Sequence, residues 1–218
     1  NKEDMNADPI IKLIQNGLII AIVFLSIIVH EFSHALAAYW LGDDSARRAG
    51  RLSLNPIKHI DLFGTIILPL LLFFSAGFVY GYAKPVPFNP YNFRNFKRDS
   101  GLTALAGPVS NMLIASAFAV VYHLLGSVPI VQVVSFYVIF MNLLLAFFNL
   151  IPVPPLDGSK VIGMALTDTA YYKWTMQERK GMIYLFAIII GSRLLGLNLI
   201  GTIVMPPVKF AMQLLGIM

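Results

Sequence analysis

His30-Glu31-Phe32-Ser33-His34 lies inside a stretch of sequence that is apolar enough to cross a lipid bilayer. The stretch runs from Ile10 to Leu41, whereas a hydrocarbon core about 30 Å thick needs only about 20 apolar residues of helix. A carboxylate at the centre of a membrane helix costs roughly 2.5–3.5 kcal/mol, so Glu31 is expected to have a partner or a function there. The pentapeptide therefore predicts a polar site within a membrane helix.

The spacing of the two histidines suits a metal ion. Residues four positions apart lie on one face of an α-helix, so His30 and His34 can bind the same zinc ion. Glu31 projects beside them, where its carboxylate can take a proton from the water that the metal activates. The three residues indicate a hydrolytic site with one Zn²⁺ per chain, buried in the membrane.

The composition excludes several other classes of protein. Of 218 residues, 57% are hydrophobic and only 12% are charged, which is typical of an integral membrane protein and not of a soluble domain. The chain contains no cysteine, so neither a thiolate zinc site nor a catalytic thiol is available. The net charge of +5 comes from basic residues in short segments between apolar runs, which favours membrane topology over nucleic-acid binding.

Apolar segments recur along the whole chain. They predict an all-α polytopic membrane protein, a bundle of about five to six transmembrane helices that forms a single integral-membrane domain over residues 1–218. The expected segments are Ile10–Leu41, Leu62–Tyr82, Leu102–Leu125, Ile130–Ile151 and Gly181–Val204, the last interrupted by Arg193 and Gly196. A short apolar tail, Val208–Met218, follows Pro206-Pro207. Small residues in Leu102–Leu125 indicate a central helix, because they let membrane helices approach closely.

Basic residues predict the orientation of the bundle. They follow the first segment (Arg47, Arg48, Arg51, Lys58), precede the third (Arg94, Lys97, Arg98) and follow the fourth (Lys160, Lys173, Arg179, Lys180). Since basic loops favour the cytoplasm, we expect a multi-pass protein with its active site nearer the cytoplasmic side. The membrane itself is expected to be a prokaryotic cell membrane.

One segment complicates this orientation. If Leu62–Tyr82 crosses the membrane completely, the first two basic groups lie on opposite sides of it. They lie on the same side if the proline-rich segment Lys84–Tyr91 returns across the membrane in extended form, or if Leu62–Tyr82 is itself re-entrant. In either case the first and fourth segments run parallel, and their C-terminal ends meet on one side.

Asp157 is the leading candidate for a third zinc ligand, because two histidines leave a catalytic site one protein ligand short. It lies in a Pro/Gly-rich turn after the fourth segment, which can fold the carboxylate back towards the bundle. On residue type alone, an aspartate in such a turn is more often a plain turn or helix-capping residue. Asp61, Asp99 and Asp168 lie in charged connecting segments and are expected to be solvated, and His59 is expected to be interfacial.

Two asparagines share a face of the fourth segment, since Asn142 and Asn149 are seven residues apart. Hydrogen bonds between helices, worth roughly 0.6–2 kcal/mol each, are the favoured role for Asn142. For Asn149 this role and a second one stay open. Its amide can hold the substrate backbone or stabilise the oxyanion of a tetrahedral intermediate.

Three motifs occur in order along the chain: His30-Glu31-Xaa-Xaa-His34, Gly107-Pro108-Val109-Ser110-Asn111, and the segment from Asn149 to Asp157-Gly158. Together they resemble the site-2 protease family of intramembrane zinc metalloproteases, over about Ile20 to Val161. The resemblance implies that His30, His34 and Asp157 are zinc ligands, that Glu31 is the catalytic acid/base, and that Asn149 contacts the substrate or the oxyanion. It also implies that Lys84–Tyr91 lies extended beside the active site and that Gly107–Asn111 supports the bundle.

The expected activity is hydrolysis of peptide bonds within or near transmembrane segments of other membrane proteins, as in regulated intramembrane proteolysis. The expected partners are therefore a transmembrane protein substrate and the lipid bilayer, with no nucleic acid. An edge strand near Val86–Tyr91 can hold an unwound substrate by strand addition. The alternatives are a membrane metal transporter, which needs a polar path through the full bilayer, and a proteolytically inactive helix-binding relative, which does not need Glu31.

Overall fold

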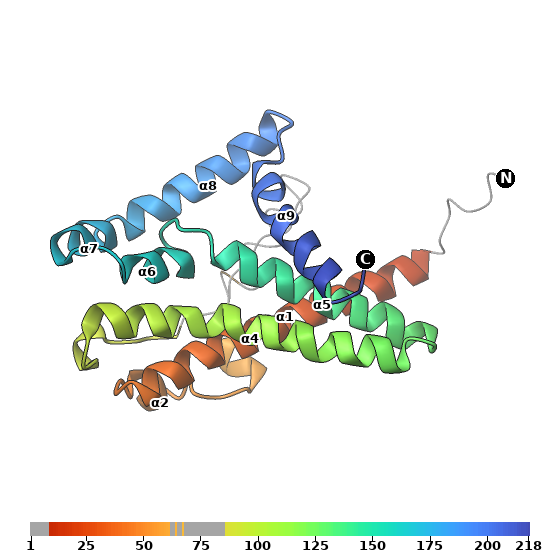
Figure 1. Cartoon of the computed structure of the whole chain (residues 1–218), viewed down its shortest axis with the longest axis horizontal. Coiled ribbons are helices and arrows are strands. Elements are labelled where there is room, and N and C mark those ends of the chain that lie inside the picture. Colours follow the sequence, from red (N-terminus) through yellow and green to blue (C-terminus); the bar gives the residue numbers. More distant parts are fainter. Residues whose placement is uncertain (1–8, 62–63, 65–66, 68–85) are drawn as a thin grey trace.

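The computed structural model describes residues 9–61, 64, 67 and 86–218, and Figure 1 shows their arrangement. Every regular element in these ranges is helical. Three of the described helices are long and apolar enough to cross a membrane: Ile14–Trp40, which is most of α1 (Pro9–Trp40), α4 (Phe96–Leu125) and α5 (Pro129–Asn149). The all-α membrane fold is confirmed, while the total of five to six spans stays a prediction.

Shorter elements connect and follow these three helices. They are α2 (Ser45–Arg48), the 3-10 turns η1 (Pro56–His59) and η3 (Pro90–Asn92), α6 (Asp157–Gly163), α7 (Asp168–Thr175), α8 (Glu178–Leu194) and α9 (Leu199–Leu214). The first and fourth predicted segments agree closely with α1 and α5. The second predicted segment, Leu62–Tyr82, lies outside the described residues except for Gly64 and Ile67.

Helix α4 begins at Phe96, earlier than the predicted start at Leu102. The side chain of Asn95 accepts a hydrogen bond from the Arg98 N–H, and the Asp99 carboxylate accepts one from the Asn95 N–H. These reciprocal bonds cap the first turn. Asp99 is buried, so the prediction that it is solvated was wrong. A count of apolar residues does not detect a helix start made of polar caps.

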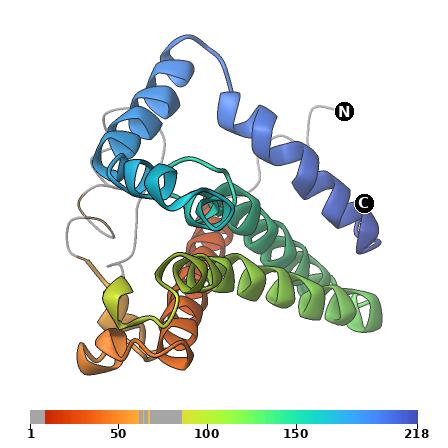
Figure 2. The same cartoon turned by 60° about the vertical axis from the view of Figure 1, so that its left-hand side comes forward.

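The C-terminal third agrees with the prediction in part. The segment expected over Gly181–Val204, with an interruption at Arg193 and Gly196, is divided there between α8 and α9, and the Asn198 side chain caps the start of α9 by accepting from the Gly201 N–H. Helix α9 continues through Pro206 and Pro207, where a break was expected. Prolines are tolerated in membrane helices whose neighbours stabilise them. Figure 2 shows α8 and α9 as two helices joined by a short turn.

The core lies where α4 packs along α1 and α5, and α9 covers α5 (Figure 1). Lipid is as apolar as leucine, so these helices depend on close approach and on interhelical hydrogen bonds. Small buried residues permit the approach on α4: Ala104, Ala115 and Ala119. Larger residues of α5 and α9 complete the core around Ile139, Leu143, Val208 and Met212.

Buried Asp43 joins the segment after α1 to the segment before α4. Its carboxylate accepts hydrogen bonds from the Asn89 N–H (2.7 Å), the Asn92 side-chain amide (2.7 Å), and the N–H and hydroxyl of Ser45 (3.0 and 2.6 Å). Burial alone would raise the pKa of Asp43, but these hydrogen bonds lower it overall. The first two basic segments therefore lie at one end of the bundle. Figure 1 shows α2, α6 and α7 at that end.

The segment before α4 is only partly as predicted. Residues 86–89 are neither helical nor turned, and Asn89 has an extended backbone. The non-helical stretch ends at Asn89, because Pro90–Asn92 forms the 3-10 turn η3. Lys84 and Pro85 lie outside the described residues. The segment available for strand addition is thus shorter than Val86–Tyr91.

Candidate metal centre and active site

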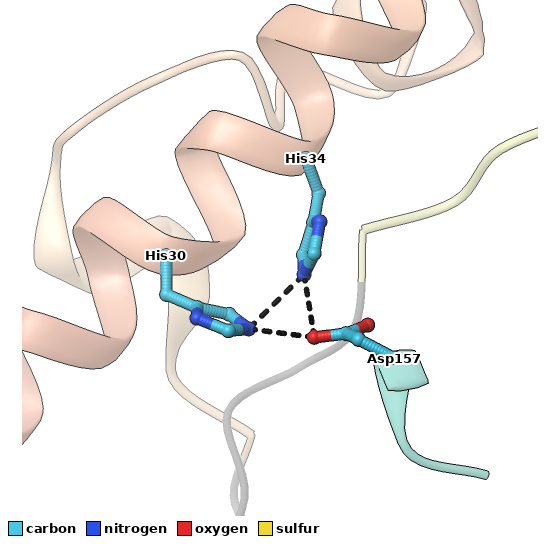
Figure 3. Close-up of side chains that lie close together, drawn as sticks. All are labelled: His30, His34 and Asp157. Carbon is cyan, nitrogen blue, oxygen red and sulfur yellow. Dashed lines mark hydrogen bonds and ion pairs between the residues drawn. The ribbon is translucent and has the colours of Figure 1, made fainter. Parts of the chain in front are cut away.

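Three side chains meet between α1 and the start of α6, as Figure 3 shows. The Nε2 atoms of His30 and His34 are 3.0 Å apart, and the Asp157 Oδ2 atom lies 3.1 Å from the first and 3.3 Å from the second. His30 is buried, and the other two residues are half-buried. The structure thus brings together the predicted ligands, which are far apart in the sequence, as parallel first and fourth segments require.

A close backbone approach returns Asp157 to the bundle. Helix α5 ends at Asn149, the proline-rich turn follows, and Asp157 is the first residue of α6. Beside it, a Cβ on Gly158 would collide with the carbonyl groups of Leu150 and Ile151. Glycine at this position therefore lets the first turn of α6 pack against the end of α5, which aims the carboxylate at the histidines.

The outer nitrogens of both imidazoles are hydrogen-bonded within the protein. His30 Nδ1 donates to the Asn111 side-chain oxygen (2.6 Å), and His34 Nδ1 donates to the Thr103 backbone carbonyl (2.7 Å). In a neutral imidazole with Nδ1 protonated, Nε2 carries a free lone pair. Two lone pairs and a carboxylate oxygen therefore point at one place, an arrangement that a cation stabilises.

The spacing of these atoms fits Zn²⁺. Zinc–ligand distances of about 2.0–2.1 Å in a tetrahedral site place neighbouring ligand atoms about 3.3 Å apart. The separations here are 3.0, 3.1 and 3.3 Å. Three protein ligands leave a fourth position for water or substrate, as catalytic zinc sites require.

Asp157 is suited to the ligand role by its charge state. Burial alone would raise the pKa of its carboxyl, but positive charge on the His34 ring and hydrogen bonds from both rings, present when Nε2 is protonated in the metal-free protein, lower it well below the usual range. The carboxyl is therefore ionised at neutral pH, which metal coordination requires.

One face of α4 supports both histidines. Thr103, Gly107 and Asn111 follow one another at intervals of four residues, so they share that face. A Cβ on Gly107 would lie 2.5 Å from His34 Nε2 and 2.6 Å from His30 Nε2. Gly107 and Asn111 were predicted only to support the bundle, and Thr103 was not predicted at all. The available signal was a small residue, Gly107, with one polar residue four positions before it and another four positions after it.

A cavity of about 230 Å³ adjoins the three candidate ligands, with room for several water molecules. Glu31 lines it, and its Oε2 atom accepts a hydrogen bond from the Val86 N–H (3.3 Å). Asn149 also lines it, with its amide donating to the Leu145 carbonyl of the same helix (3.0 Å). The structure therefore places both predicted catalytic residues beside the candidate metal centre, while their roles stay predictions.

Other residues around the cavity were not predicted. Lys160 Nζ lies 4.7 Å from the centre of the Phe88 ring, and both residues line the cavity. The buried hydroxyl groups of Ser100 and Thr103 line it too, and within the described part of the chain they have no hydrogen-bond partner. His59 is not part of the ligand cluster. It is fully buried within the protein and donates to the Ser53 carbonyl (2.6 Å), while its position at the membrane interface stays a prediction.

Comparison with known proteins gives several relatives. A family model described as Peptidase family M50 matches residues 126–194. "Putative zinc metalloprotease YwhC" of Bacillus subtilis is 39% identical over 191 residues, which cover 82% of this chain and 83% of the relative. "Putative zinc metalloprotease Rip2" of Mycolicibacterium smegmatis is 27% identical, with 70% of this chain and 60% of the relative covered.

A third relative comes from an archaeon. "Putative zinc metalloprotease MJ0611" of Methanocaldococcus jannaschii is 30% identical over 95 residues, which are 43% of this chain and 50% of the relative. The chain thus spans most of the Bacillus relative but less than two thirds of the other two. No solved structure matches it. The extent and identity of the Bacillus match show that the chain belongs to peptidase family M50, the site-2 protease family that its motifs resemble.

Proposed function

We propose that this chain is a zinc metalloprotease that hydrolyses peptide bonds within or near transmembrane segments of other membrane proteins. The observation that carries the proposal is the meeting of two imidazole nitrogens and one carboxylate oxygen inside a bundle of membrane helices, beside Glu31. His30, His34 and Asp157 hold one Zn²⁺ in this proposal, and residues 1–218 act as a single integral-membrane domain.

The chain's own residues supply the proton transfers. When bound, zinc supplies a Lewis acid that activates water and polarises the scissile carbonyl. The Glu31 carboxylate accepts the proton of the attacking water and then delivers it to the leaving amine nitrogen. One N–H of the Asn149 amide is engaged with Leu145, which leaves the second N–H for the developing oxyanion or the substrate backbone.

The substrate must expose its backbone to reach this site. A transmembrane helix satisfies its own carbonyl and N–H groups, so the target segment has to unwind before hydrolysis. Residues 86–89 form no helix or turn and begin beside Glu31, and an unwound substrate can pair with their backbone as an added strand. We assign the active site to the cytoplasmic side of a prokaryotic cell membrane, because the basic segments gather at the same end of the bundle.

A reconstitution experiment tests the proposal. Purified protein loaded with zinc is placed in liposomes with a panel of labelled transmembrane peptides, and cleavage is followed by mass spectrometry. Glu31→Gln is expected to retain zinc and lose cleavage, because it keeps the candidate ligands and removes the proton acceptor. Asp168→Asn is the matched control, since it removes a carboxylate whose side chain is 94% exposed and lies outside the cavity lining.

Each other outcome has a defined meaning. Cleavage by Glu31→Gln at the wild-type rate would refute the acid/base role. Zinc flux into the liposomes without any cleavage would favour a metal transporter. Binding of the peptides by zinc-loaded wild-type protein without cleavage would favour an inactive helix-binding relative.

A further inference from the structure

We propose that Ser26, Asn142 and Asn111 form a directed chain of hydrogen bonds that fixes the tautomer and orientation of His30 as a metal ligand. The inference rests on the proposed zinc site and names residues that position it. None of the three lies among the candidate ligands or the residues that line the cavity. They come from three different membrane helices: α1, α5 and α4.

Backbone carbonyls determine which groups donate and which accept at the end of the hydrogen-bond chain farthest from His30. The Asn142 side-chain NH₂ group donates to the Val138 carbonyl (2.9 Å) and to the Ser26 hydroxyl (2.9 Å). That hydroxyl in turn donates to the Ile22 carbonyl (2.7 Å). A carbonyl can only accept, so Asn142 has its NH₂ group on this side and its oxygen on the other.

The direction then passes to His30. The Asn142 oxygen accepts from the Asn111 NH₂ group (2.8 Å), which leaves the Asn111 oxygen facing His30 Nδ1 (2.6 Å). His30 Nδ1 must therefore donate, so in the neutral ring it is Nε2, which faces Asp157 and His34, that carries the lone pair. In each of these hydrogen bonds, the donor and the acceptor can therefore be assigned in only one way.

The two histidines differ in how they are held. His34 donates directly to a backbone carbonyl, whose orientation is set by helix α4. His30 donates to a side-chain amide, and an amide can present either its oxygen or its NH₂ group. A reversed Asn111 would place donors against His30 Nδ1 and favour protonation at Nε2, which cannot then bind metal. The Asn142 oxygen (2.8 Å) and, more weakly, the Ser26 backbone carbonyl (3.5 Å) accept from the Asn111 NH₂ group and prevent that reversal.

Burial makes this control effective. Asn111 and Asn142 have no exposed surface, and Ser26 is 5% exposed, so bulk water does not compete for their bonds. Hydrogen bonds that only joined the helices would stabilise the bundle with His30 in either tautomer. The directed chain predicts an effect on one histidine alone, and that effect separates positioning from packing.

The test uses Asn142→Leu, which leaves His30 and Asn111 in place but removes the shorter of the two hydrogen bonds that orient Asn111. In metal-free protein labelled with ¹⁵N-histidine, NMR chemical shifts report the tautomer of each ring. We expect His30 to change from the Nδ1-protonated form to a mixture, while His34 keeps its form as an internal reference. Chelator competition should show zinc affinity weakened by about 10–100-fold, the usual cost of losing an outer-shell partner.

A milder pair of variants covers the case in which Asn142→Leu does not fold. Ser26→Ala removes a hydroxyl that accepts from Asn142, and it is expected to weaken zinc binding less than Asn142→Leu does. Ser192→Ala is the matched control, because Ser192 is also buried and also donates to a carbonyl of its own helix (Ile189, 3.0 Å). Ser192→Ala should bind zinc as the wild type does.

Wild-type zinc affinity together with an unchanged His30 tautomer in Asn142→Leu would overturn the inference. If that variant does not fold, equal zinc affinity in Ser26→Ala and Ser192→Ala would overturn it. Failure of the wild type to bind zinc would refute the proposed function, whereas the tautomer in metal-free protein still decides whether the chain of hydrogen bonds orients His30.

Discussion

Gly107→Ala is expected to disable the candidate metal centre without touching a ligand. The added Cβ would lie 2.5 Å from His34 Nε2 and 2.6 Å from both Cε1 and Nε2 of His30. Ordinary contact begins near 3.4 Å, so the His34 nitrogen has to retreat by about 0.9 Å (3.4 minus 2.5). Both rings are tied through Nδ1 to Asn111 and to the Thr103 carbonyl, which limits that movement.

The magnitude follows from the small tolerance of a zinc site. Ligand distances in such sites vary by only about 0.2 Å, far less than the required shift. An extra methylene in a well-packed interior costs about 1–3 kcal/mol, which corresponds to zinc binding weaker by about 5- to 150-fold. Loss of cleavage should accompany the loss of zinc.

The assay compares zinc affinity, by chelator competition, with the melting temperature of the metal-free protein. Gly191→Ala is the matched control, since it makes the same helical substitution where a Cβ would meet nothing within 4 Å. It should bind zinc as the wild type does. Wild-type zinc affinity and activity in Gly107→Ala would refute the close approach of α4 to the histidines.

Three further predictions follow from other contacts. Asp43→Asn should lower the melting temperature by removing at least one charge-assisted hydrogen bond, worth about 1.5–3 kcal/mol. Because folding lowers the Asp43 pKa, this stabilisation is present above the unfolded value of about 4 and is lost as pH falls through the folded value. The difference from wild type should therefore shrink in acid, and a pH-independent difference would contradict this reasoning. Single cysteines at Arg51 and Lys97, in a chain without native cysteine, should be labelled from the same side of the membrane, and opposite-side labelling would contradict the shared end. Asp157→Ala should lose zinc in metal analysis, whereas full retention would remove Asp157 from the ligand set.

Local patterns in the sequence predicted the parts of the site that depend on one helix. The spacing of His30 and His34 is a property of an α-helix alone, and the position of Glu31 follows from it. Asp157 required a longer argument, in which the first and fourth apolar segments run parallel, and the meeting of the three side chains agrees with it. The apolar runs likewise predicted α1 and α5 closely.

The features that no local sequence pattern predicted depend on contacts between elements. The polar cap of α4 and the burial of Asp99 appear only once the first turn folds back on itself. The continuation of α9 through Pro206 and Pro207 depends on the neighbouring helices. No pattern within one segment shows that Asn111 hydrogen-bonds His30, because that bond joins residues 81 positions apart.

These contacts suggest how a charged site is maintained inside an apolar bundle. Each histidine has one nitrogen directed to the site and the other bound to α4, so α4 positions ligands that it does not itself supply. Asn111 and Asn142 add interhelical hydrogen bonds at the place where polar groups are most costly to leave unpaired. One face of α4 therefore both joins the helices and positions the candidate zinc ligands.

The most direct measurement is X-ray absorption at the zinc edge of the purified, zinc-loaded protein, combined with metal analysis. We expect one zinc per chain, with two histidine nitrogens and one carboxylate oxygen at about 2.0–2.2 Å. Asp157→Ala should change that spectrum, and His59→Ala should leave it unaltered. A protein that binds no zinc, or a zinc spectrum that changes in His59→Ala but not in Asp157→Ala, would contradict a metal centre shared by α1 and α6.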